Sequence, residues 1–318
     1  MKGLTIALLG DPALGPLLAK KGTESDLRFF NLKREQGAIT FIEPARYPDK
    51  VQPLIQALAM ADAAILSVDK IDRFLGEQII AIDSIGLERG FIILNNYMQM
   101  DEVAPFLKGT PLSGWPVLGR DANKVNDALL AMDIPAKDGP VKVPVDHFFN
   151  VKGVGTVVLG CVRRGTVRQH GELEAYPTGK NALVRSIQVH DSDVPEAGFG
   201  NRVGLALKNI DVADLDRGHV LAPSGSLLAS QSLKLELRAS RFWKGELREG
   251  AIVHCSSGLQ IVPARVRDAD GGSLKGGATG CATFSFERPL VHEKGERILV
   301  LDLDSKGLRV VCWGVSSG

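Results

Sequence analysis

The stretch that decides the fold is residues 146–177, DHFFNVKGVGTVVLGCVRRGTVRQHGELEAYP. Short apolar runs alternate here with glycines, and no segment shows the three-to-four residue repeat of an amphipathic helix. The β-branched residues Thr156, Val157 and Val158 suit a pleated surface. Glycines at strand ends permit tight corners and positive φ angles. Closely spaced strands without helices predict a small β-barrel.

The sequence on either side of this stretch has two different patterns. Before residue 135, continuous apolar runs such as LTIALL and GFIILN alternate with helical segments, which predicts a doubly wound, mostly parallel sheet. After residue 226 the chain again consists of short β-like segments, which predicts a second barrel. We therefore expect a multi-domain protein with an α/β domain at 1–135, a Pro/Gly linker at 136–144, and β-barrels at 145–225 and 226–318.

Composition narrows the class of protein without naming a function. The 318 residues carry 38 basic and 37 acidic side chains, so bulk charge gives no argument for DNA or RNA binding. The four cysteines form no CxxC pair, which favours free thiols in a reducing cytoplasm over a disulfide framework or a metal site. No signal peptide and no apolar run of about 18 residues is present, so we expect no membrane partner.

The barrel stretch resembles the second domain of the elongation factor Tu family of translational GTPases, which carries the pattern G-x-G-T-V-x-x-G-x-V-x-x-G. The resemblance extends over about 80 residues, and the first domain is similar in a collinear way. The segment LAKKGTESD is most similar to the selenocysteine-specific branch, so the chain is identified as an archaeal-type paralogue of that branch. The resemblance implies a P-loop-GTPase-like domain followed by two barrels. The matching positions are Gly153, Gly155, Thr156, Val157, Gly160, Val162, Gly165, Arg202, Gly204, Arg217 and Gly218.

The first nucleotide motif is degenerate. Gly10 and Gly15 have the spacing of G-x-x-x-x-G-K-[ST], but Pro16 and Leu17 stand where the lysine and the hydroxyl residue are needed. Proline removes both a charge and a backbone N–H, and leucine cannot ligate Mg²⁺. Asp11 adds a carboxylate that repels phosphate. Taken alone, the two glycines are better explained as a plain strand-to-helix turn.

The D-x-P-G-H stretch of the family reads EPARY at 43–47, so that Glu43 opens it, Arg46 replaces the glycine, and Tyr47 replaces the water-positioning histidine. The family's switch threonine has a possible counterpart in Thr40.

The guanine-reading motif N-K-x-D falls on ILNNYMQ. Asn95 is retained, whereas Asn96 and Met98 replace the lysine and the guanine-binding aspartate. Losing the lysine, the magnesium ligand and the aspartate costs about 5–9 kcal/mol if the terms add. A loss of this size lowers the affinity for guanine nucleotide by a factor on the order of 10³–10⁶. We therefore expect a pseudo-GTPase with no catalytic residue and no cofactor. GTP and Mg²⁺ are expected as ligands only if the degenerate site still binds them.

Three functions remain open from the sequence. The family resemblance favours binding of tRNA or the ribosome. It implies that the aminoacyl end of tRNA lies between the first domain and the middle barrel, with its acceptor arm along the last barrel. A scaffold that contacts translation proteins is the second, and a binder of an altered nucleotide is the third. Basic and aromatic residues that could stack on RNA or neutralise it are equally explained as solvated arginines and a packed tryptophan. These candidates are Arg163, Arg164, Arg168, Arg238, Arg241, Trp243 and Lys244.

Overall fold

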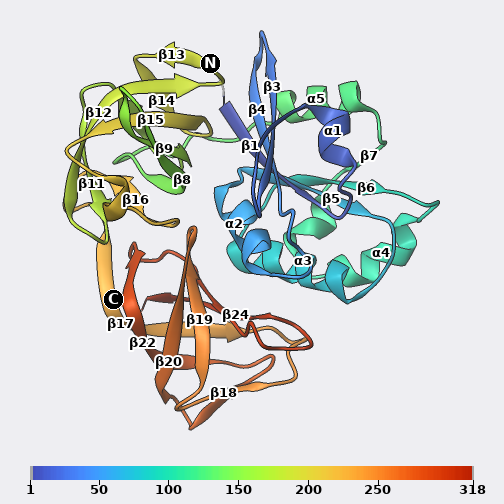
Figure 1. Cartoon of the computed structure of the whole chain (residues 1–318). Coiled ribbons are helices and arrows are strands. Elements are labelled where there is room, and N and C mark those ends of the chain that lie inside the picture. The colour runs from blue at the N-terminus through green and yellow to red at the C-terminus, as the bar shows by residue number, and fades with distance from the viewer. Residues whose placement is uncertain (1–2, 317–318) are drawn as a thin grey trace.

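The continuous apolar runs of the first domain form a sheet covered by helices on both faces, in a computed structural model that describes residues 3–316 (Figure 1). The strand order is β2-β3-β4-β1-β5-β6-β7, with β1, β4, β5, β6 and β7 parallel to one another. The strands are β1 (Gly3–Leu9), β2 (Lys20–Glu24), β3 (Arg28–Arg34), β4 (Gly37–Glu43), β5 (Ala63–Val68), β6 (Gly90–Leu94) and β7 (Val117–Leu118).

The helices divide between the two faces of this sheet. Leu54, Leu75 and Val103 bring three helices into one apolar cluster, and Leu14 and Val125 bring two helices into the cluster on the other face. The helices are α1 (Leu14–Leu18), α2 (Gln52–Met60), α3 (Arg73–Ile85), α4 (Met100–Leu107) and α5 (Ala122–Ala131), and Pro111–Gly114 forms a 3-10 turn. The doubly wound α/β arrangement expected from the sequence is confirmed. The antiparallel pair β2–β3 and helix α4 are additions to that expectation.

The middle barrel begins with β8 and closes through six strands in the order β11-β16-β8-β9-β15-β12, since β11 also pairs with β12. Its interior is built from valine, leucine and isoleucine side chains that alternate inward along each strand. The strands are β8 (Val143–Val151), β9 (Gly155–Cys161), β10 (Thr166–Arg168), β11 (Glu172–Tyr176), β12 (Lys180–Val189), β13 (Ser192–Val194), β14 (Glu196–Gly198), β15 (Arg202–Lys208) and β16 (Val220–Ala222), with a 3-10 turn at Val212–Asp214.

The last barrel is closed by six strands in the order β17-β22-β20-β19-β23-β24, so the second barrel expected from the sequence is also present. Phe284 and Trp243 are buried in its core. None of the helices within residues 3–316 has the length and apolar character required to traverse a bilayer. The strands are β17 (Leu228–Ala239), β18 (Glu246–Arg248), β19 (Ile252–Ser257), β20 (Gln260–Ala269), β21 (Ser273–Lys275), β22 (Thr279–His292), β23 (Ile298–Leu301) and β24 (Val310–Ser316).

Apolar clusters join the three domains to one another. Leu299 and Val310 of the last barrel belong to the same buried cluster as helices α2 and α3 of the first domain. Cys161 of the middle barrel and Leu259 of the last barrel share a second cluster with Phe29 of the first domain. Burying such surface stabilises by roughly 25 cal/mol per Å². The two barrels therefore pack against the first domain through shared cores.

Candidate functional site

A cavity of about 440 Å³ opens at the carboxyl ends of β1, β4 and β5, where open α/β sheets hold their ligands. It brings together Gly10 and Asp11 from one part of the sequence and Glu43 and Tyr47 from another. Gly10 has φ +94°, and a Cβ at this position would lie 1.9 Å from the backbone oxygen of Ser67. Glycine is therefore required here so that β1 and β5 can approach each other.

The loop from Asp11 to Pro16 has few N–H groups left to offer a phosphate. Pro12 and Pro16 carry none. The N–H of Ala13 donates to Asp11 Oδ1 at 2.8 Å, and that of Leu14 donates to the Asp11 backbone oxygen at 3.2 Å. Helix α1 behind the loop spans a single turn of five residues, with Pro16 and Leu17 exposed on it. A phosphate-binding loop needs convergent free amides, whereas Ala13 and Leu14 use theirs within this loop.

Phe30 explains how this short helix is held. The ring of Phe30 lies against Gly15, where an added Cβ would approach a ring carbon within 2.3 Å. Gly15 and Leu14 are both buried in the cluster that covers this face of the sheet. The second glycine of the degenerate motif thus serves the packing of α1 on the hairpin formed by β3 and β4.

The charged side chains that line this cavity are mainly acidic. Four carboxylates face two cations, which gives a net charge of −2 (2 − 4). Both cations are paired, because Arg28 Nη1 lies 3.0 Å from Glu43 Oε1 and Lys70 Nζ lies 3.1 Å from Asp72 Oδ2. Burial raises the pKa of Glu43 against the opposing effect of Arg28. The charged lining residues are Asp11, Glu43, Asp69, Asp72, Arg28 and Lys70.

The EPARY stretch forms a turn beside this cavity. Tyr47 donates its hydroxyl proton to the backbone oxygen of Phe74 at 3.0 Å, and its ring packs edge-on against Phe74. Burial and the nearby Glu77 raise the pKa of Tyr47. Arg46 is exposed and closes the turn by accepting the Lys50 N–H on its backbone oxygen. Tyr47 is thereby a packed, neutral side chain, and Arg46 points to solvent.

The NNYM segment follows β6 and lies at the same edge of the sheet. Asn95 donates from its side-chain nitrogen to Ser67 Oγ at 2.8 Å. Asn96 and Tyr97 both have positive φ angles, at 52° and 60°. Met98 packs against the apolar cluster that contains helices α2 and α3. The retained asparagine is therefore used to join β5 to β6, and a thioether occupies the position of the guanine-binding carboxylate.

Thr40 lies apart from the other candidates. It sits in β4 between Thr5 and Asn31, and strand alternation directs it to the face that packs on the middle barrel. There it lines a different cavity of about 260 Å³, between the first domain and the middle barrel. Lys33, His190 and Arg202 also line that cavity.

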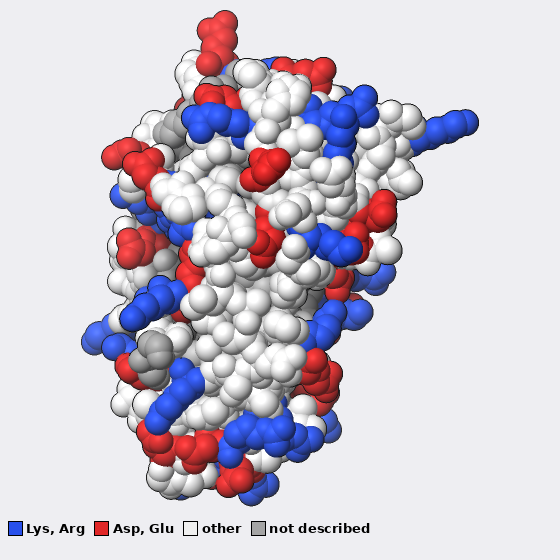
Figure 2. All heavy atoms as spheres, turned by 90° about the vertical axis from the view of Figure 1, so that its left-hand side faces the viewer, with Lys and Arg blue, Asp and Glu red and all other residues white. Residues whose placement is uncertain are grey.

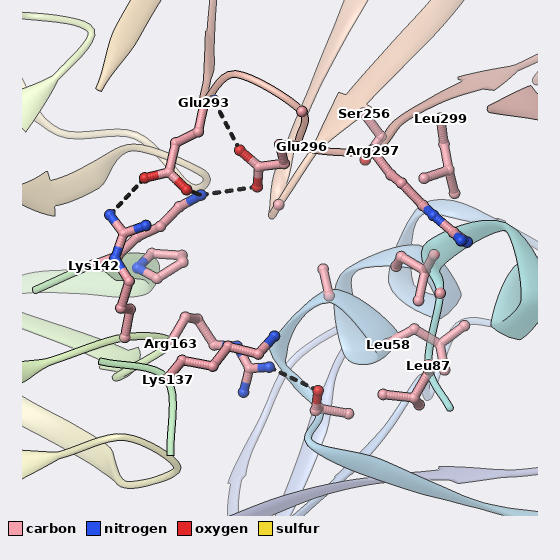
Figure 3. Close-up of a pocket in the computed structure, with 18 of the residues that line it drawn as sticks. Leu58, Leu87, Lys137, Lys142, Arg163, Ser256, Glu293, Glu296, Arg297 and Leu299 are labelled. Carbon is pink, nitrogen blue, oxygen red and sulfur yellow. Dashed lines mark hydrogen bonds and ion pairs between the residues drawn. The ribbon is translucent and has the colours of Figure 1, made fainter. Parts of the chain in front are cut away.

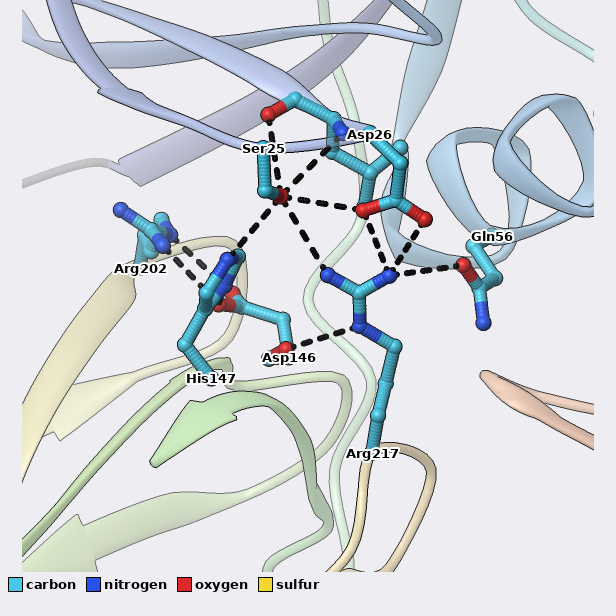
Figure 4. A network of polar contacts seen from close by, with 8 residues as sticks. Ser25, Asp26, Gln56, Asp146, His147, Arg202 and Arg217 are labelled. Atoms are coloured by element: carbon cyan, nitrogen blue, oxygen red, sulfur yellow. Dashed lines mark hydrogen bonds and ion pairs between the residues drawn. The ribbon is translucent and has the colours of Figure 1, made fainter. Parts of the chain in front are cut away.

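A polar network joins the β2–β3 hairpin to the middle barrel (Figure 4). Arg217 Nη1 reaches Asp26 Oδ2 at 2.6 Å, and its Nε donates to the backbone oxygen of Asp146 at 3.0 Å. Ser25 Oγ lies 3.1 Å from His147 Nε2, whose Nδ1 lies 2.6 Å from Asp146 Oδ1. Arg202 makes two hydrogen bonds to that same buried carboxylate. Although burial opposes its charge, the nearby Arg202 keeps the pKa of Asp146 below its ordinary value.

The RNA candidates divide into two groups. Arg163 and Arg164 are used inside the protein, in ion pairs with Asp62 and Glu293 at 2.5 Å each. Trp243 is buried in the core of the last barrel, as the structural interpretation of the sequence predicted. Arg168 is exposed and pairs with Glu196, and the remaining exposed candidates are Arg238, Arg241 and Lys244.

Sequence reasoning missed the two arginines that pair with carboxylates of this cavity. Arg120 lies 2.7 Å from Asp11 Oδ2, and Arg28 binds Glu43 with both carboxylate oxygens within 3.1 Å. Arg28 and Glu43 are direct neighbours across β3 and β4. The cross-strand pairing of two opposite charges was the available signal, but using it required recognising β3 as a strand.

Comparisons with known proteins agree with this geometry. The elongation factor Tu domain 2 family matches residues 155–222. An uncharacterized protein of Methanocaldococcus jannaschii is 36% identical over 308 residues, which cover 96% of this chain and 97% of that protein. The selenocysteine-specific elongation factor of the same organism is 26% identical over 336 residues, covering 93% of this chain and 71% of that protein.

Solved structures show the same fold. The crystal structure of translation elongation factor SelB from Methanococcus maripaludis, in complex with a GTP analogue, superposes with a TM-score of 0.83 at 23% identity, covering 100% of this chain and 79% of that chain. The barrel motif, the domain order and the full-length relatives agree, and the chain belongs to the translational GTPase superfamily.

Proposed function

We propose that this elongation-factor-like protein works without guanine nucleotide and binds tRNA or another part of the translation machinery in one fixed arrangement of its domains. The observation that carries the first half is the cavity at the carboxyl ends of β1, β4 and β5. Its lining has a net charge of −2, and both of its cations are already paired. A nucleoside triphosphate that entered this cavity would meet carboxylates. The lysine and the metal ligand that offset the charge of its phosphates in the family are missing.

Polar contacts between the domains support the fixed arrangement. In a nucleotide-driven switch, the γ-phosphate shifts the balance between two states through its different contacts in each. Here the β2–β3 hairpin is tied to the middle barrel by Arg217, and helix α3 is tied to the last barrel by the ion pair of Glu77 with Arg309. Without a phosphate to sense, these contacts hold one geometry.

The partner half of the proposal is motivated by the relatives. The resemblance to translational GTPases implies that the aminoacyl end of tRNA lies between the first domain and the middle barrel. In this structure that seam contains the cavity lined by Lys33, His190 and Arg202. Burial and the neighbouring Lys33 lower the pKa of His190, so its imidazole is neutral at pH 7. Exposed Arg238 and Arg241 on the last barrel add positive charge for a nucleic-acid backbone.

The test of the nucleotide half is calorimetry with GTP and GDP in the presence of Mg²⁺, on protein shown to be free of nucleotide. We expect no binding heat at high micromolar protein. Clear binding, lost when residues 11–16 are replaced, would contradict the proposal and return the protein to the possible switches. A thermal-shift screen of other nucleotides tests the altered-nucleotide alternative, because a ligand at 100 times its Kd stabilises by about 2.7 kcal/mol.

The test of the partner half is tRNA binding at low salt, followed across a salt series. We expect the salt slope to fall by about one for each phosphate contact removed by Arg238→Gln or Arg241→Gln. Arg288→Gln, which removes an exposed arginine paired with Asp216, serves as the control. Absence of binding to any tRNA at low salt would contradict this half.

A protein partner is the second candidate, and one surface favours it. Figure 2 shows a band of uncharged residues running along the outer face of the two barrels, with Lys, Arg, Asp and Glu interspersed at its margins. Depletion of charged residues is typical of the centre of protein contacts, whereas nucleic acid requires a continuous basic surface. Partners that remain bound after RNase treatment in a pull-down would favour this function over tRNA binding.

A further inference from the structure

A second cavity, of about 590 Å³, lies where the three domains meet (Figure 3). Its walls come from the carboxyl ends of α2 and α3, the segment 137–144 before the middle barrel, and the turn between β22 and β23 of the last barrel. It is separate from the cavity at the strand ends, with which it shares no lining residue. This junction cavity therefore depends on how all three domains are placed.

The lining of the junction cavity is basic. Six cations and three carboxylates give a net charge of +3 (6 − 3), and counting Asp62 behind the wall still leaves +2. The basic residues are Lys137, Lys142, Arg163, Arg164, Lys294 and Arg297.

Two of these cations neutralise helix ends. Arg163 donates to the backbone oxygens of Met60 and Ala61, at 2.7 and 2.9 Å, where α2 ends. Arg297 donates to the Asp83 and Ser84 oxygens near the end of α3. Cations at helix carboxyl ends are favourable because they complement the helix dipole. Both side chains therefore have structural roles, and the contacts of Arg163 with Met60, Asp62 and Ala61 use three of its five N–H groups.

Two further cations are neutralised by carboxylates. Lys142 Nζ lies 2.8 Å from Glu296 Oε1 and 3.4 Å from Glu293 Oε2. Arg164 Nη2 lies 2.5 Å from Glu293 Oε1. Figure 3 shows Lys142, Glu293 and Glu296 on the side of the cavity opposite Leu58 and Leu87. The remaining cations of the lining are Lys137 and Lys294.

Lys137 is one of two lining cations, together with Lys294, for which the described residues offer no hydrogen-bond or ion-pair partner. Among the residues that the structure describes, no hydrogen bond or ion pair is made by its ammonium group, and Figure 3 shows it beside Arg163. Burial by surrounding atoms and the charge of Arg163 lower the pKa of Lys137. Much of the residue still faces solvent, as does Lys294, so a ligand can reach both. Asp62 and Glu296 oppose this lowering of the pKa, and a bound anion would favour the charged ammonium further.

We propose that the junction cavity binds a small phosphorylated molecule, whose phosphate lies against Lys137 and Arg163. A phosphate group supplies several acceptor oxygens and more than one negative charge, which matches an unpartnered ammonium beside a guanidinium. A volume of about 590 Å³ is in the range of pockets for small organic molecules. This binding goes beyond the proposed function. It uses neither the cavity at the strand ends nor the cavity between the first domain and the middle barrel.

The experiment is calorimetric titration of the full chain with tripolyphosphate at constant ionic strength. Wild-type protein is compared with Lys137→Gln and with a matched control, Lys152→Gln, which removes an exposed lysine from a loop of the middle barrel. We expect Lys137→Gln to weaken binding about tenfold or more, as for the loss of a charged hydrogen bond, and Lys152→Gln to change it less than about twofold. Both variants alter exposed side chains and leave the cores intact.

The outcomes separate the proposal from its alternatives. No binding of tripolyphosphate at millimolar concentration would overturn it, and so would equal weakening by the two variants, which indicates a general effect of charge. An oligoribonucleotide without a terminal phosphate that binds more tightly, with the same dependence on Lys137, would also overturn it and assign the cavity to nucleic acid.

Discussion

The cavity at the strand ends and the cavity at the domain junction differ in the sign of their charge. The first occupies the position where α/β sheets bind ligands, yet its lining has a net charge of −2. The second has no counterpart in the nucleotide motifs, yet its lining has a net charge of +3. A fold provides positions for chemistry, but the side chains decide whether a phosphate is attracted or repelled. In this chain, the attraction for phosphate lies at the junction.

The largest effect is expected from Arg163→Ala, which tests how the wall of the junction cavity is built. The Asp62 side chain is 0% exposed and pairs with Arg163, so the substitution leaves a buried charge uncompensated. Breaking such a pair costs about 3–5 kcal/mol in the free energy of unfolding. Urea denaturation measures it, with Arg168→Ala, whose pair is exposed, expected to cost less than about 1 kcal/mol. Equal losses in the two variants would show that Arg163 has no special structural role.

A smaller effect is expected from Arg217→Ala. This substitution tests the contact between the β2–β3 hairpin and the middle barrel. Arg217 and Asp26 are partly exposed, at 24% and 32% of their side chains. We expect a loss of about 1–3 kcal/mol in urea denaturation and faster proteolysis in the β2–β3 hairpin. Arg288→Ala, which removes a more exposed pair between the two barrels, should change neither. Unchanged proteolysis of the hairpin would show that apolar packing alone fixes it.

The pH dependence of the junction cavity should be weaker still, and opposite for binding and for stability. The pKa of Lys137 in the folded protein lies below its ordinary value of 10.5, because of burial and Arg163. Between the two values the unfolded chain holds more protons, so this group makes the ligand-free protein more stable as pH rises. Tripolyphosphate affinity should fall over the same range as the ammonium loses its charge. Titrations between pH 7 and pH 10 check this, and an unchanged slope in Lys137→Gln would contradict it.

The smallest effect is expected where the family motif is restored by Pro16→Lys with Leu17→Thr. The lysine and the hydroxyl would return, but α1 remains a single turn, and Ala13 and Leu14 still donate to Asp11. We expect no GTP binding in calorimetry with Mg²⁺. Micromolar binding by this variant would show that the cavity retains its nucleotide geometry and that only two side chains were missing.

The domain architecture was predictable because it depends on local patterns. The glycine-punctuated segments of the two barrels and the apolar runs of the first sheet each specify their elements over a few residues. The β2–β3 pair escaped prediction because β2 is exposed along its whole length, so it carries no alternation of apolar and polar residues. Helix α4 was missed in a segment that includes an internal proline, Pro105.

The charged sites were less predictable because their partners are distant in the sequence. Arg163 reads as an exposed basic residue in VRRG, and only the fold places it against Asp62, about 100 residues earlier. The loss of the P-loop lysine was visible in the sequence, whereas the internal use of the loop amides was not. The junction cavity combines short segments of all three domains, and no single stretch contains enough of it to form a motif.

The pairing of β3 with β4 bears on how such a protein is controlled. These strands are matched over seven residue pairs, from Arg28 opposite Glu43 to Arg34 opposite Gly37, so the segment that leads to Glu43 is fixed in a hairpin. In a factor driven by GTP, hydrolysis of the bound nucleotide determines when the cargo is released. If this chain binds its partner without nucleotide, as we propose, no hydrolysis step sets the time of release. The fraction of the protein that is bound then depends on the concentrations of the protein, of its partner and of competitors for that partner.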